Sequence, residues 1–584
     1  MLRRARLLVT ALVVLAALLG GAVAHAADTF RFHGSGYGHG IGMSQWGAYG
    51  MAKDGWSHKR ILTHFYSGTR VGTSTGLPNK LRVGIAADRT KIHLGARNGP
   101  VRLWLDGPGT TFLAEIPAGR TWTVSAAPTA RQYAIRDQAG TLVGGVKWGG
   151  PAHPLFATFA GAGARAFVLE ADDVWHQGFA YAYGFLEFDL TDCADRCLER
   201  LTIELPFEKY LRGMGEMPSS WPAEALRTQA VAARTFATYK IKHYGLRSTC
   251  DCHLLDGASD QVYVGWNKES GADGDRWVAA VVGTAGEVVT YQGSVIQAFY
   301  AASDGGYSED VEDVWHGGNP AYAIPYLRGV CDPGEYTSAN PWTDWMRSFT
   351  ASSLSSRLAP YTGAIGTITR FRDIQRGESG RIVSAIAHGT AGKGSVEGDE
   401  LRRALGLPDA RVWINSDRNI VGAVRTKYDD VMCRPGLPRS TVVALDHGSR
   451  QLFQRGGIYR NGQVGLTIWL KGAIHDEYLG AGGASGRLGL PVSGAVAVKR
   501  AYAAATCSSC RRIVLEGGRI YFKATVGAHA LWGPVLSAYL DHGGAKGALG
   551  YPTTRVSVVD GVRRASFEHG SIACANGSCS VSVG

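Results

Sequence analysis

A long helix is predicted directly after Ser220, and the rest of the chain must pack around it. Ser219 and Ser220 offer N-cap hydroxyls, and Pro222 suits a position in the first turn. Glu224 places a negative charge near the positive end of the helix dipole. The predicted core face is formed by Leu226, Ala230, Ala233 and Ala237. Because this stripe is mostly small, another backbone can approach the helix closely.

Glu216 lies just before this helix, on a loop marked by Gly213, Gly215 and Pro218. A loop that runs into the N-terminus of an anchored helix can hold a carboxylic acid at the edge of a cleft. The alternative is a solvated loop carboxylate without a chemical role. Glu216 is therefore a candidate for acid and base chemistry.

The residues from Glu216 onward form a long and specific motif, EMPSSWPAEALRTQAVAARTFA, at positions 216 to 237. This motif resembles the signature of the stage II sporulation protein D and amidase enhancer family. The resemblance implies a bacterial protein that acts on peptidoglycan, with Glu216 as its catalytic acid. It also makes Arg234 and Trp221, which lie within the motif, candidate substrate-binding residues.

Residues 30 to 69 carry a second motif, in which every second residue from position 34 to position 42 is glycine. In an extended conformation one face of this segment would carry no side chains, so that a ligand or another backbone could lie against it. A short helix near Ser44 or Gln45 and a second helix from Ser57 are expected to follow. For His39, a structural role is the alternative to a functional one.

The pattern GxGHGxGMSQxGA in this segment is similar to a second hallmark of the same family. The resemblance makes His39, Ser44 and Gln45 candidate substrate-binding residues. In the family this pattern commonly stands at the C-terminal end of the domain, whereas here it precedes Glu216. We therefore expect a circular permutation or a displaced terminal segment, in which residues 30 to 69 fold back onto the domain that contains Glu216.

Short alternating runs of apolar and polar residues extend from Leu81 to about Leu201, separated by glycine, proline and aspartate. They predict an antiparallel sheet or a small barrel. Residues 364 to 415 carry two further strand-like runs and a short helix, and they match the closing part of the family domain. With 79 glycines, the chain is expected to be an α+β, β-rich multidomain protein whose catalytic domain has strands around a key helix.

The word S-D-G-G at positions 303 to 306 follows a predicted buried strand that begins near Val295. A tight turn of this kind exposes backbone N–H groups and a hydroxyl, which suit sugar hydroxyls and acetamido groups. Most such words are plain turns, but the resemblance implies that Ser303, Gly305 and Gly306 line a catalytic groove. Stacking on sugar faces, or burial in the core, is expected for three tryptophans, Trp221, Trp266 and Trp315.

The N-terminus has arginines, an apolar run from Leu7 and an A-x-A word at positions 24 to 26, which together predict a secretory signal peptide. An uncleaved membrane anchor is the alternative. We expect the mature protein to be secreted and associated with the cell wall. The net charge of +12 suits a polyanionic wall, whereas the scattered arginines do not suggest nucleic acid as a partner.

Ten cysteines in an exported chain indicate disulfides rather than free thiols. Three pairs are close in sequence, and Cys331 and Cys433 could join distant segments. The close pairs are Cys193 with Cys197, Cys507 with Cys510, and Cys574 with Cys579.

Cys250, Cys252 and His253 are candidate zinc ligands. Structural zinc usually takes four ligands at a wider spacing than C-x-C, so the sequence favours a disulfide here. Some members of the resembling family bind a metal before a Q-V-Y word, but in this chain Asp260 stands immediately before that word. We expect no cofactor, with zinc as the alternative.

The last part of the chain repeats itself, since KGAIHDEYLGAGGASGRLGLPVS aligns with WGPVLSAYLDHGGAKGALGYPTT at a constant spacing. Such a period indicates stacked small units. The words resemble the LGFP repeats of secreted proteins, which implies a module that holds the chain at the envelope. A spacer without a ligand is the alternative.

The resemblance implies an exported lytic transglycosylase that cleaves MurNAc–GlcNAc glycan strands and leaves 1,6-anhydroMurNAc ends, with Glu216 as general acid and base. Spacing does not exclude hydrolysis with a second acid. A non-catalytic glycan binder that enhances a cell-wall amidase is the second hypothesis, and a wall-associated structural protein is the third.

The expected segments are a signal peptide (1–26), a glycine-rich part of the catalytic domain (27–75), a β-rich part (80–200), a catalytic core (201–415), a linker (416–445) and a wall-binding repeat module (446–584).

Overall fold

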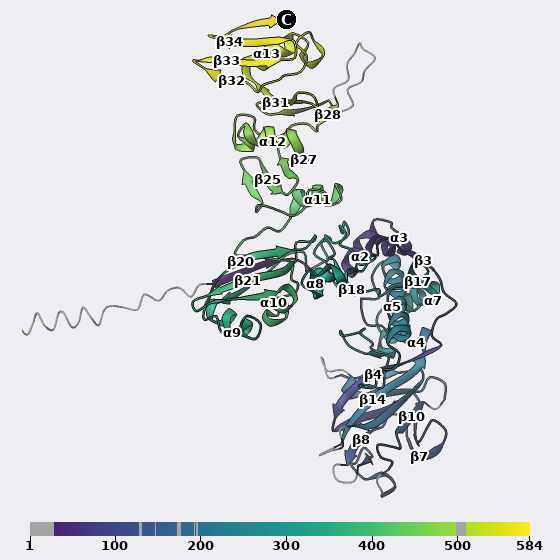
Figure 1. Cartoon of the computed structure of the whole chain (residues 1–584). Helices are drawn as coiled ribbons and strands as arrows, with labels where there is room; N and C mark the ends of the chain where they lie inside the picture. The colour runs from purple at the N-terminus through teal and green to yellow at the C-terminus, as the bar shows by residue number, and fades with distance from the viewer. Residues whose placement is uncertain are drawn as a thin grey trace, which may run out of the picture.

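The computed structural model describes residues 29–127, 131–145, 148–159, 161–171, 177–191, 193, 197–497 and 510–584. The predicted signal peptide lies outside these ranges. The described part has the α+β, β-rich fold that the sequence predicts, built from several small sheets. Figure 1 shows a lobe of strands, a helical region above it, a second lobe beside the helices, and a column of small sheets that ends at the C-terminus.

The strand lobe contains two mainly antiparallel sheets whose buried side chains belong to one core. The larger sheet has the order β15-β4-β14-β13-β10-β6-β7, and the smaller has the order β12-β11-β5-β8-β9. The strands predicted between Leu81 and Leu201 are confirmed, and in the described strands the two sheets stay open rather than closing into a barrel. The bounds are β4 Lys80–Arg89, β5 Lys91–Arg97, β6 Val101–Leu105, β7 Thr111–Ile116, β8 Thr121–Ala127, β9 Gln132–Arg136, β10 Leu155–Phe159, β11 Arg165–Val168, β12 Phe179–Tyr181, β13 Phe185–Thr191, β14 Leu198–Pro206 and β15 Leu254–Leu255.

The predicted long helix is α5, Ala223–Tyr244. Its N-cap is Pro222 and no side chain caps it, so the prediction that Ser219 or Ser220 caps the helix is wrong. The reason is local, since the Trp221 N–H donates to the Pro218 carbonyl at 3.2 Å and closes a turn before the helix begins. The predicted core face, from Leu226 to Ala237, is buried. The neighbouring helices are α4 Phe207–Arg212, α6 Trp266–Ser270 and α7 Gly274–Gly283.

The N-terminal segment folds back onto the domain that contains Glu216, as predicted. The strand β1, Thr29–Gly34, pairs with β19, Trp345–Thr350, and with β23, Val412–Ile414. Further along, β2 (Met43–Ser44) pairs with β18 (Tyr300–Ala301), and β3 (Arg70–Thr73) pairs with β16 (Glu287–Tyr291), which also pairs with β17 (Ser294–Val295). The predicted helices are α2, Gln45–Lys53, and α3, His58–Phe65, and both contact α5.

The glycine-rich stretch after β1 is not the extended strand that we predicted. Gly36, Gly38, Gly40 and Gly42 all have positive φ, so the backbone turns repeatedly. The predicted close approach is nevertheless present. A Cβ at Gly40 would lie 2.1 Å from the Arg381 guanidinium carbon, and one at Gly42 would lie 2.2 Å from the Phe299 carbonyl oxygen. Glycine is needed here both for its conformation and for its size.

The second lobe has its own core, to which Phe30 and Phe32 of β1 contribute. The predicted hairpin and short helix of residues 364 to 415 are confirmed as β20, Ile368–Arg376, β21, Ile382–Gly389, and α10, Gly398–Leu405. The lobe also contains α9, Ala351–Thr362, and β22, Lys393–Glu397. The long strand expected from Val295 is reduced to the short β17 and β18, and the chain then enters α8, Val311–Trp315.

The predicted disulfides are present wherever both cysteines are described. Three of them close short loops, Cys193–Cys197, Cys250–Cys252 and Cys574–Cys579. The fourth, Cys331–Cys433, joins segments 102 residues apart. The predicted partner of Cys510, Cys507, lies outside the described residues.

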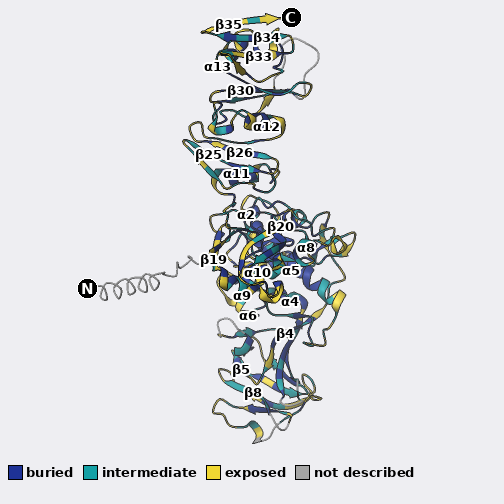
Figure 2. Ribbon diagram, turned by 60° about the vertical axis from the view of Figure 1, so that its left-hand side comes forward, coloured by how far each residue is buried: buried dark blue, intermediate teal, exposed yellow. Residues whose placement is uncertain are grey.

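The C-terminal column consists of three four-stranded sheets stacked on one another (Figures 1 and 2). The expected linker is not extended throughout, because it contains α11, Gly422–Asp430, which packs on the first sheet. The repeated words fall on two equivalent helices, α12, Gly472–Gly480, and α13, Gly533–Asp541. The strands are β24 Val443–Leu445, β25 Gly448–Phe453, β26 Gly456–Asn461, β27 Leu466–Leu470, β28 Val496–Ala497, β29 Arg511–Leu515, β30 Gly518–Lys523, β31 Gly527–Trp532, β32 Ser557–Val559, β33 Val562–Phe567, β34 Gly570–Ala575 and β35 Ser578–Val583.

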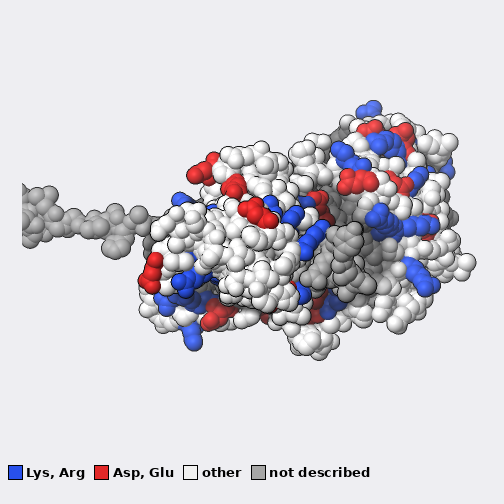
Figure 3. Space-filling model, turned by 90° about the horizontal axis from the view of Figure 1, so that it is seen from above, with Lys and Arg blue, Asp and Glu red and all other residues white. Residues whose placement is uncertain are grey.

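The surface seen from above carries basic and acidic side chains side by side (Figure 3). On this face the net charge of +12 is therefore not gathered into one basic patch. Among the described helices, none is both long and apolar enough to cross a membrane.

Candidate active site

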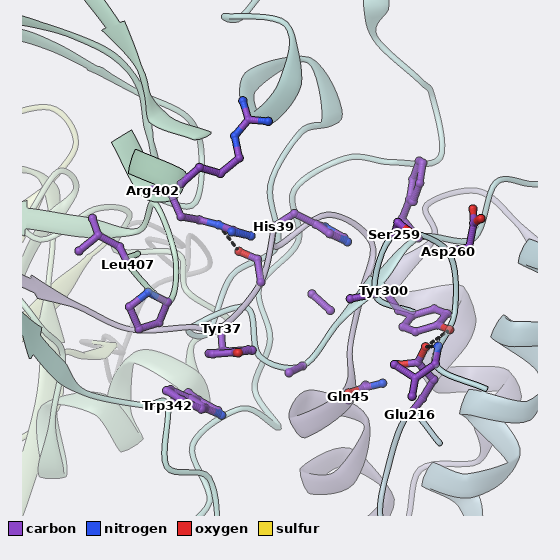
Figure 4. A pocket seen from close by; sticks show the side chains of 18 of the residues that line it. Tyr37, His39, Gln45, Glu216, Ser259, Asp260, Tyr300, Trp342, Arg402 and Leu407 are labelled. Atoms are coloured by element: carbon purple, nitrogen blue, oxygen red, sulfur yellow. Dashed lines mark hydrogen bonds between the residues drawn. The ribbon is translucent and has the colours of Figure 1, made fainter. Parts of the chain in front are cut away.

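A cleft of about 830 Å³ lies where three parts of the chain meet. Glu216 and residues 258–262 form one part of its wall, and the glycine-rich segment with residues 299–302 forms another. Trp342, Arg347 and the end of α10 supply the third part, from the second lobe. Figure 4 shows side chains from all three parts around the same space, with Glu216 and Tyr37 at opposite sides of it.

The Glu216 carboxyl group is held in place by hydrogen bonds. Its Oε1 accepts from the Val262 N–H at 2.7 Å and from the Tyr300 hydroxyl at 3.1 Å. The Gln45 side chain lines the same cleft and also lowers the Glu216 pKa. The two hydrogen bonds come from different segments of the chain, so they fix the position of the carboxyl group in the cleft wall.

The surroundings of Glu216 favour its protonated form. Burial raises the pKa of Glu216, and this effect outweighs the hydrogen bonds from Val262 and Tyr300 and the charge of Lys268, which lower it. Burial in turn lowers the pKa of Lys268 to about 8, although the charge of Glu216 opposes that shift. A carboxylic acid with a raised pKa keeps its proton closer to neutral pH, as a general acid must.

A buried chain of hydrogen bonds orients Tyr300 toward Glu216. The Tyr210 hydroxyl donates to Gln261 Oε1 at 3.0 Å, and Gln261 Nε2 donates to the Tyr300 hydroxyl at 2.9 Å. Tyr210 and Gln261 are both fully buried. Because the Tyr300 oxygen accepts from Gln261, its own proton is directed at Glu216.

Two residues predicted from the glycine-rich motif, His39 and Gln45, line the cleft. His39 Nδ1 accepts from the Ile41 N–H at 2.9 Å, and burial together with the positive charges of Arg402 and Arg381 lowers the His39 pKa to about 3. The imidazole is therefore neutral near pH 7. Gln45 Nε2 donates to Gln229 Oε1 at 3.2 Å, which fixes the Gln45 amide beside Glu216.

The wall opposite Glu216 is aromatic and basic. The rings of Tyr37 and Trp342 lie 4.2 Å apart, and Tyr37 is 45% exposed. Arg402 donates from Nε to the Gly38 carbonyl at 3.2 Å, and Arg347 and Arg403 also line the cleft. This wall offers flat apolar faces beside groups that bind carboxylates, sulfates or phosphates.

Four other predicted binding residues, Ser44, Ser303, Gly305 and Gly306, do not line the cleft. Their polar groups are engaged within the protein. The Ser44 hydroxyl donates to Glu335 at 2.8 Å and caps α2, while the Ser303 hydroxyl and the Gly305 N–H donate to Glu335 as well. The Gly306 N–H donates to Asp304 at 2.7 Å. These motif residues hold the turn together, and their contact with substrate stays a prediction.

Arg234 and Trp221 also lie outside the cleft lining. Arg234 is fully buried and binds Glu208 through two hydrogen bonds of 2.8 and 2.9 Å. Trp221 is 8% exposed and packs on Trp46 at a ring distance of 4.5 Å. Both signature residues support the fold around Glu216, and their contact with substrate stays a prediction.

The candidate zinc ligands do not form a metal site. Cys250 and Cys252 are joined by a disulfide, so neither offers a thiolate. His253 Nδ1 accepts from the Arg82 N–H at 2.9 Å. Asp260, which stands before the Q-V-Y word, is paired with Lys240 and Arg247.

Sequence reasoning missed Tyr37, Tyr300, Trp342 and Arg402 in the cleft wall. For Tyr37 and Tyr300 a signal was available, since both stand inside segments that had already been singled out. Arg402 also stands in such a segment, the predicted short helix within residues 364 to 415, whereas Trp342 does not. They reach the cleft only because the second lobe packs beside the glycine-rich segment, which is a property of the tertiary structure.

Two family models match parts of the chain. Residues 199–291 match SpoIID, the stage II sporulation protein family, and residues 488–547 match the LGFP repeat. The first match contains Glu216 and α5, and the second contains the four strands of the middle sheet of the column and the helix α13. The chain therefore carries a SpoIID domain followed by LGFP repeats.

Several curated proteins are similar to part of the chain. It is 34% identical over 167 residues to an uncharacterized protein of Brachyspira hyodysenteriae, covering 27% of this chain and 40% of that protein. It is 28% identical over 221 residues to stage II sporulation protein D of Bacillus subtilis, covering 35% of this chain and 59% of that protein. It is 34% identical over 142 residues to the amidase enhancer of Bacillus subtilis, covering 24% of this chain and 17% of that protein. In all three, the match spans less than two thirds of the relative.

Proposed function

We propose that this chain, with its SpoIID domain and LGFP repeats, is an exported peptidoglycan lytic transglycosylase. Its substrate would be the glycan strand, cleaved at the bond between MurNAc and GlcNAc. The observation that carries the proposal is Glu216, a single carboxyl group fixed in the wall of a cleft and shifted toward its protonated form. The names of two relatives, a sporulation protein and an amidase enhancer, support a role at the bacterial envelope.

The chemistry needs one group that both donates and accepts a proton. Protonated Glu216 donates its proton to the glycosidic oxygen as the bond from that oxygen to the muramyl C1 breaks. The resulting carboxylate then accepts the proton of the muramyl C6 hydroxyl while O6 forms a bond to C1. The products are a 1,6-anhydroMurNAc end and a new GlcNAc hydroxyl, and Glu216 returns to its protonated form.

The contacts of Asp260, the second acid in the cleft wall, favour this reaction over ordinary hydrolysis. Among the described residues that line the cleft, the acids are Glu216 and Asp260. Asp260 lies 2.9 Å from Lys240 Nζ and 2.7 Å from Arg247 Nη2, and it accepts from the Leu255 N–H at 2.9 Å. Because cations and an N–H occupy its oxygens, the Asp260 carboxylate is not free to hold an attacking water. A two-carboxylate hydrolase needs such a base or nucleophile, whereas the transglycosylase uses Glu216 twice.

The opposite wall suits a glycan that carries carboxylates. Tyr37 and Trp342 present aromatic faces on which sugar rings stack. Arg347, Arg402 and Arg403 stand nearby and would contact the carboxylates that muramyl residues or their peptides carry. A strand bound along this wall would pass across the cleft toward Glu216.

Mass spectrometry of the products tests the proposal. Isolated sacculi and purified glycan strands would be incubated with the full chain, and the released muropeptides analysed. We expect ends that carry 1,6-anhydroMurNAc. New reducing ends without the anhydro form would show hydrolysis instead of transglycosylation. Strands that remain uncut would contradict any catalytic function of the chain.

An alternative function is favoured by one specific observation, the similarity to a protein named amidase enhancer. In that case the cleft would bind glycan strands and present them to a separate cell-wall amidase. The two functions differ in a mixed assay. An enhancer raises the rate of an added amidase without cleaving strands itself, and it keeps this effect when Glu216 is changed to Gln.

We predict that removing residues 471–584 leaves activity on soluble glycan unchanged but abolishes binding to sedimented cell walls. This cut removes the whole LGFP match and keeps the first sheet of the column, which packs on α11. Co-sedimentation with isolated walls is the measurement. The full-length Glu216→Gln protein serves as the control and should sediment normally. If the shortened chain sediments as well as the full chain, the repeats are not the anchor.

We also predict that Tyr300→Phe moves the alkaline limb of the pH–activity profile to higher pH. The general acid must start protonated, so kcat/KM falls as the pH rises through the pKa of Glu216. The hydrogen bond from Tyr300 lowers that pKa, and its loss therefore raises it further. As a matched control, Tyr66→Phe removes a buried hydroxyl that donates to the Phe299 carbonyl and leaves Glu216 untouched. An unchanged limb in Tyr300→Phe, or an equal shift in Tyr66→Phe, would contradict this assignment.

A further inference from the structure

Three buried carboxyl groups meet at the S-D-G-G turn. One oxygen from each of Asp304, Asp332 and Glu335 lies within 4.8 Å of the other two, and each of these residues is at most 1% exposed. Two oxygens bound to the same Ca²⁺ at its usual distances are at most about 5 Å apart. The spacing therefore allows one ion to contact all three side chains.

Two oxygens in this cluster have no hydrogen-bond partner. Asp304 Oδ1 accepts from the Gly306 N–H at 2.7 Å, and Asp332 Oδ1 accepts from the Gly334 N–H at 2.8 Å. In the described part of the chain, the Oδ2 atom of each aspartate is buried and unpaired. Burying such atoms costs free energy unless something compensates them, and a cation or a proton can do so.

No described arginine forms an ion pair with these three carboxyl groups. Arg381 comes near Asp304, but it donates to the Asp304 backbone carbonyl, at 2.9 Å, and its charge is paired with Asp409 at 2.7 Å. Arg425 comes near Asp332, but it reaches only the backbone carbonyl, at 3.5 Å, and its charge is paired with Asp429 at 2.6 Å. A second acidic cluster, formed by Glu187, Asp189 and Asp251, shows the contrast. There Arg82 binds Glu187 at 2.7 Å and Asp251 at 2.5 Å, and Arg200 binds Asp189 at 2.9 Å.

We propose that Asp304, Asp332 and Glu335 bind one divalent cation of the calcium class. The donors are all hard carboxylate oxygens, which Ca²⁺ and Mg²⁺ prefer, whereas zinc prefers nitrogen and sulfur ligands. Ca²⁺ fits a buried site better, because it accepts irregular geometry and backbone carbonyls as additional ligands. Mg²⁺ usually keeps several of its waters.

The cation would fasten the turn that supports one wall of the cleft. Glu335 also accepts from Ser44, Ser303, Gly305 and Asn340. Ser303 in turn pairs with Tyr37 through two backbone hydrogen bonds of 2.9 and 3.1 Å. The site therefore links the N-terminus of α2, the S-D-G-G turn and the exposed ring of Tyr37. This inference does not depend on the reaction proposed above.

Calcium titration of the full chain tests the proposal. After treatment with EGTA, we expect calorimetry to show Ca²⁺ binding that is lost in Asp332→Asn and Asp304→Asn. At a Ca²⁺ concentration 100 times the Kd, the melting temperature of the unaltered chain should rise by about 5–10 °C, and EGTA should reverse the rise. Asp189→Asn in the arginine-paired cluster is the matched control and should keep both effects.

Two results would contradict the proposed calcium site. One is an unaltered chain that binds no Ca²⁺ and melts at the same temperature with EGTA, which would leave a shared proton as the explanation of the unpaired oxygens. The other is undiminished Ca²⁺ binding in both aspartate variants. If neither variant folds, the titration of the unaltered chain alone decides, because absence of binding there is sufficient to reject the proposal.

Discussion

Glu216→Gln is expected to lower the turnover of glycan strands by about 10²- to 10⁴-fold, the usual contribution of a positioned acid–base group. Glutamine has nearly the same volume, and its carbonyl oxygen still accepts from the Val262 N–H and the Tyr300 hydroxyl. It cannot protonate the leaving oxygen. We therefore expect the melting temperature and glycan binding to stay close to those of the unaltered chain, while 1,6-anhydro products disappear from the mass spectrum.

Glu224→Gln is the matched control for this substitution. Glu224 belongs to the same segment, but its carboxylate binds the His58 backbone N–H at 2.6 Å and the His58 ring at 2.8 Å, away from the cleft lining. Its loss of charge should affect stability and leave turnover intact. If Glu224→Gln loses turnover and Glu216→Gln keeps it, Glu216 is not the acid.

Deleting residues 29–73 is expected to unfold both the SpoIID domain and the second lobe. The segment contributes eight large apolar side chains that are at most 3% exposed. At about 1.5–3 kcal/mol each, their burial is worth about 12 kcal/mol or more, which is comparable to the whole stability of a typical domain. They are Phe30, Phe32, Ile41, Met43, Met51, Ile61, Leu62 and Phe65. Circular dichroism during heating should show no cooperative transition for this part of the chain.

A larger deletion at the other end provides the control. Removing residues 471–584 takes away more of the chain, yet it leaves the cores around α5 and in the second lobe untouched. Their melting should be unchanged. If the chain without residues 29–73 stays soluble and melts cooperatively at the original temperature, the segment is an accessory and not part of the domain.

Local sequence patterns were sufficient to predict most of the helices and strands. The strands between Leu81 and Leu201, the N-cap of α3 at Ser57 and the buried stripe of α5 depend on alternation and spacing within a few residues. The start of α5 and the path of the glycine-rich segment were mispredicted. The first depends on a local turn, closed by the Trp221 N–H and the Pro218 carbonyl, that propensities did not reveal. The second depends on distant contacts, such as the approach of Arg381 to Gly40, that no local pattern encodes.

The candidate site was predictable only in part, for the same reason. Glu216, His39 and Gln45 lie in the cleft, as motifs alone had suggested. Ser44 and Ser303 belong to equally prominent motifs, but Glu335, almost 300 residues after Ser44 in sequence, binds both hydroxyls and directs them inward. A motif marks residues that the fold needs as well as residues that touch a ligand, and only the partners distinguish the two.

The pairing of β1 with β19 and β23 dictates the order in which the protein can acquire its fold. Phe32 pairs with Arg347 and Ile414. At a synthesis rate of about 5–20 residues per second, roughly 20–80 seconds separate the appearance of Phe32 from that of its last partner. During this time Phe30 and Phe32 have no core to enter, and the strand is open to pairing with other chains. We therefore expect misfolded chains to pair through β1, because this strand waits longest for its partners.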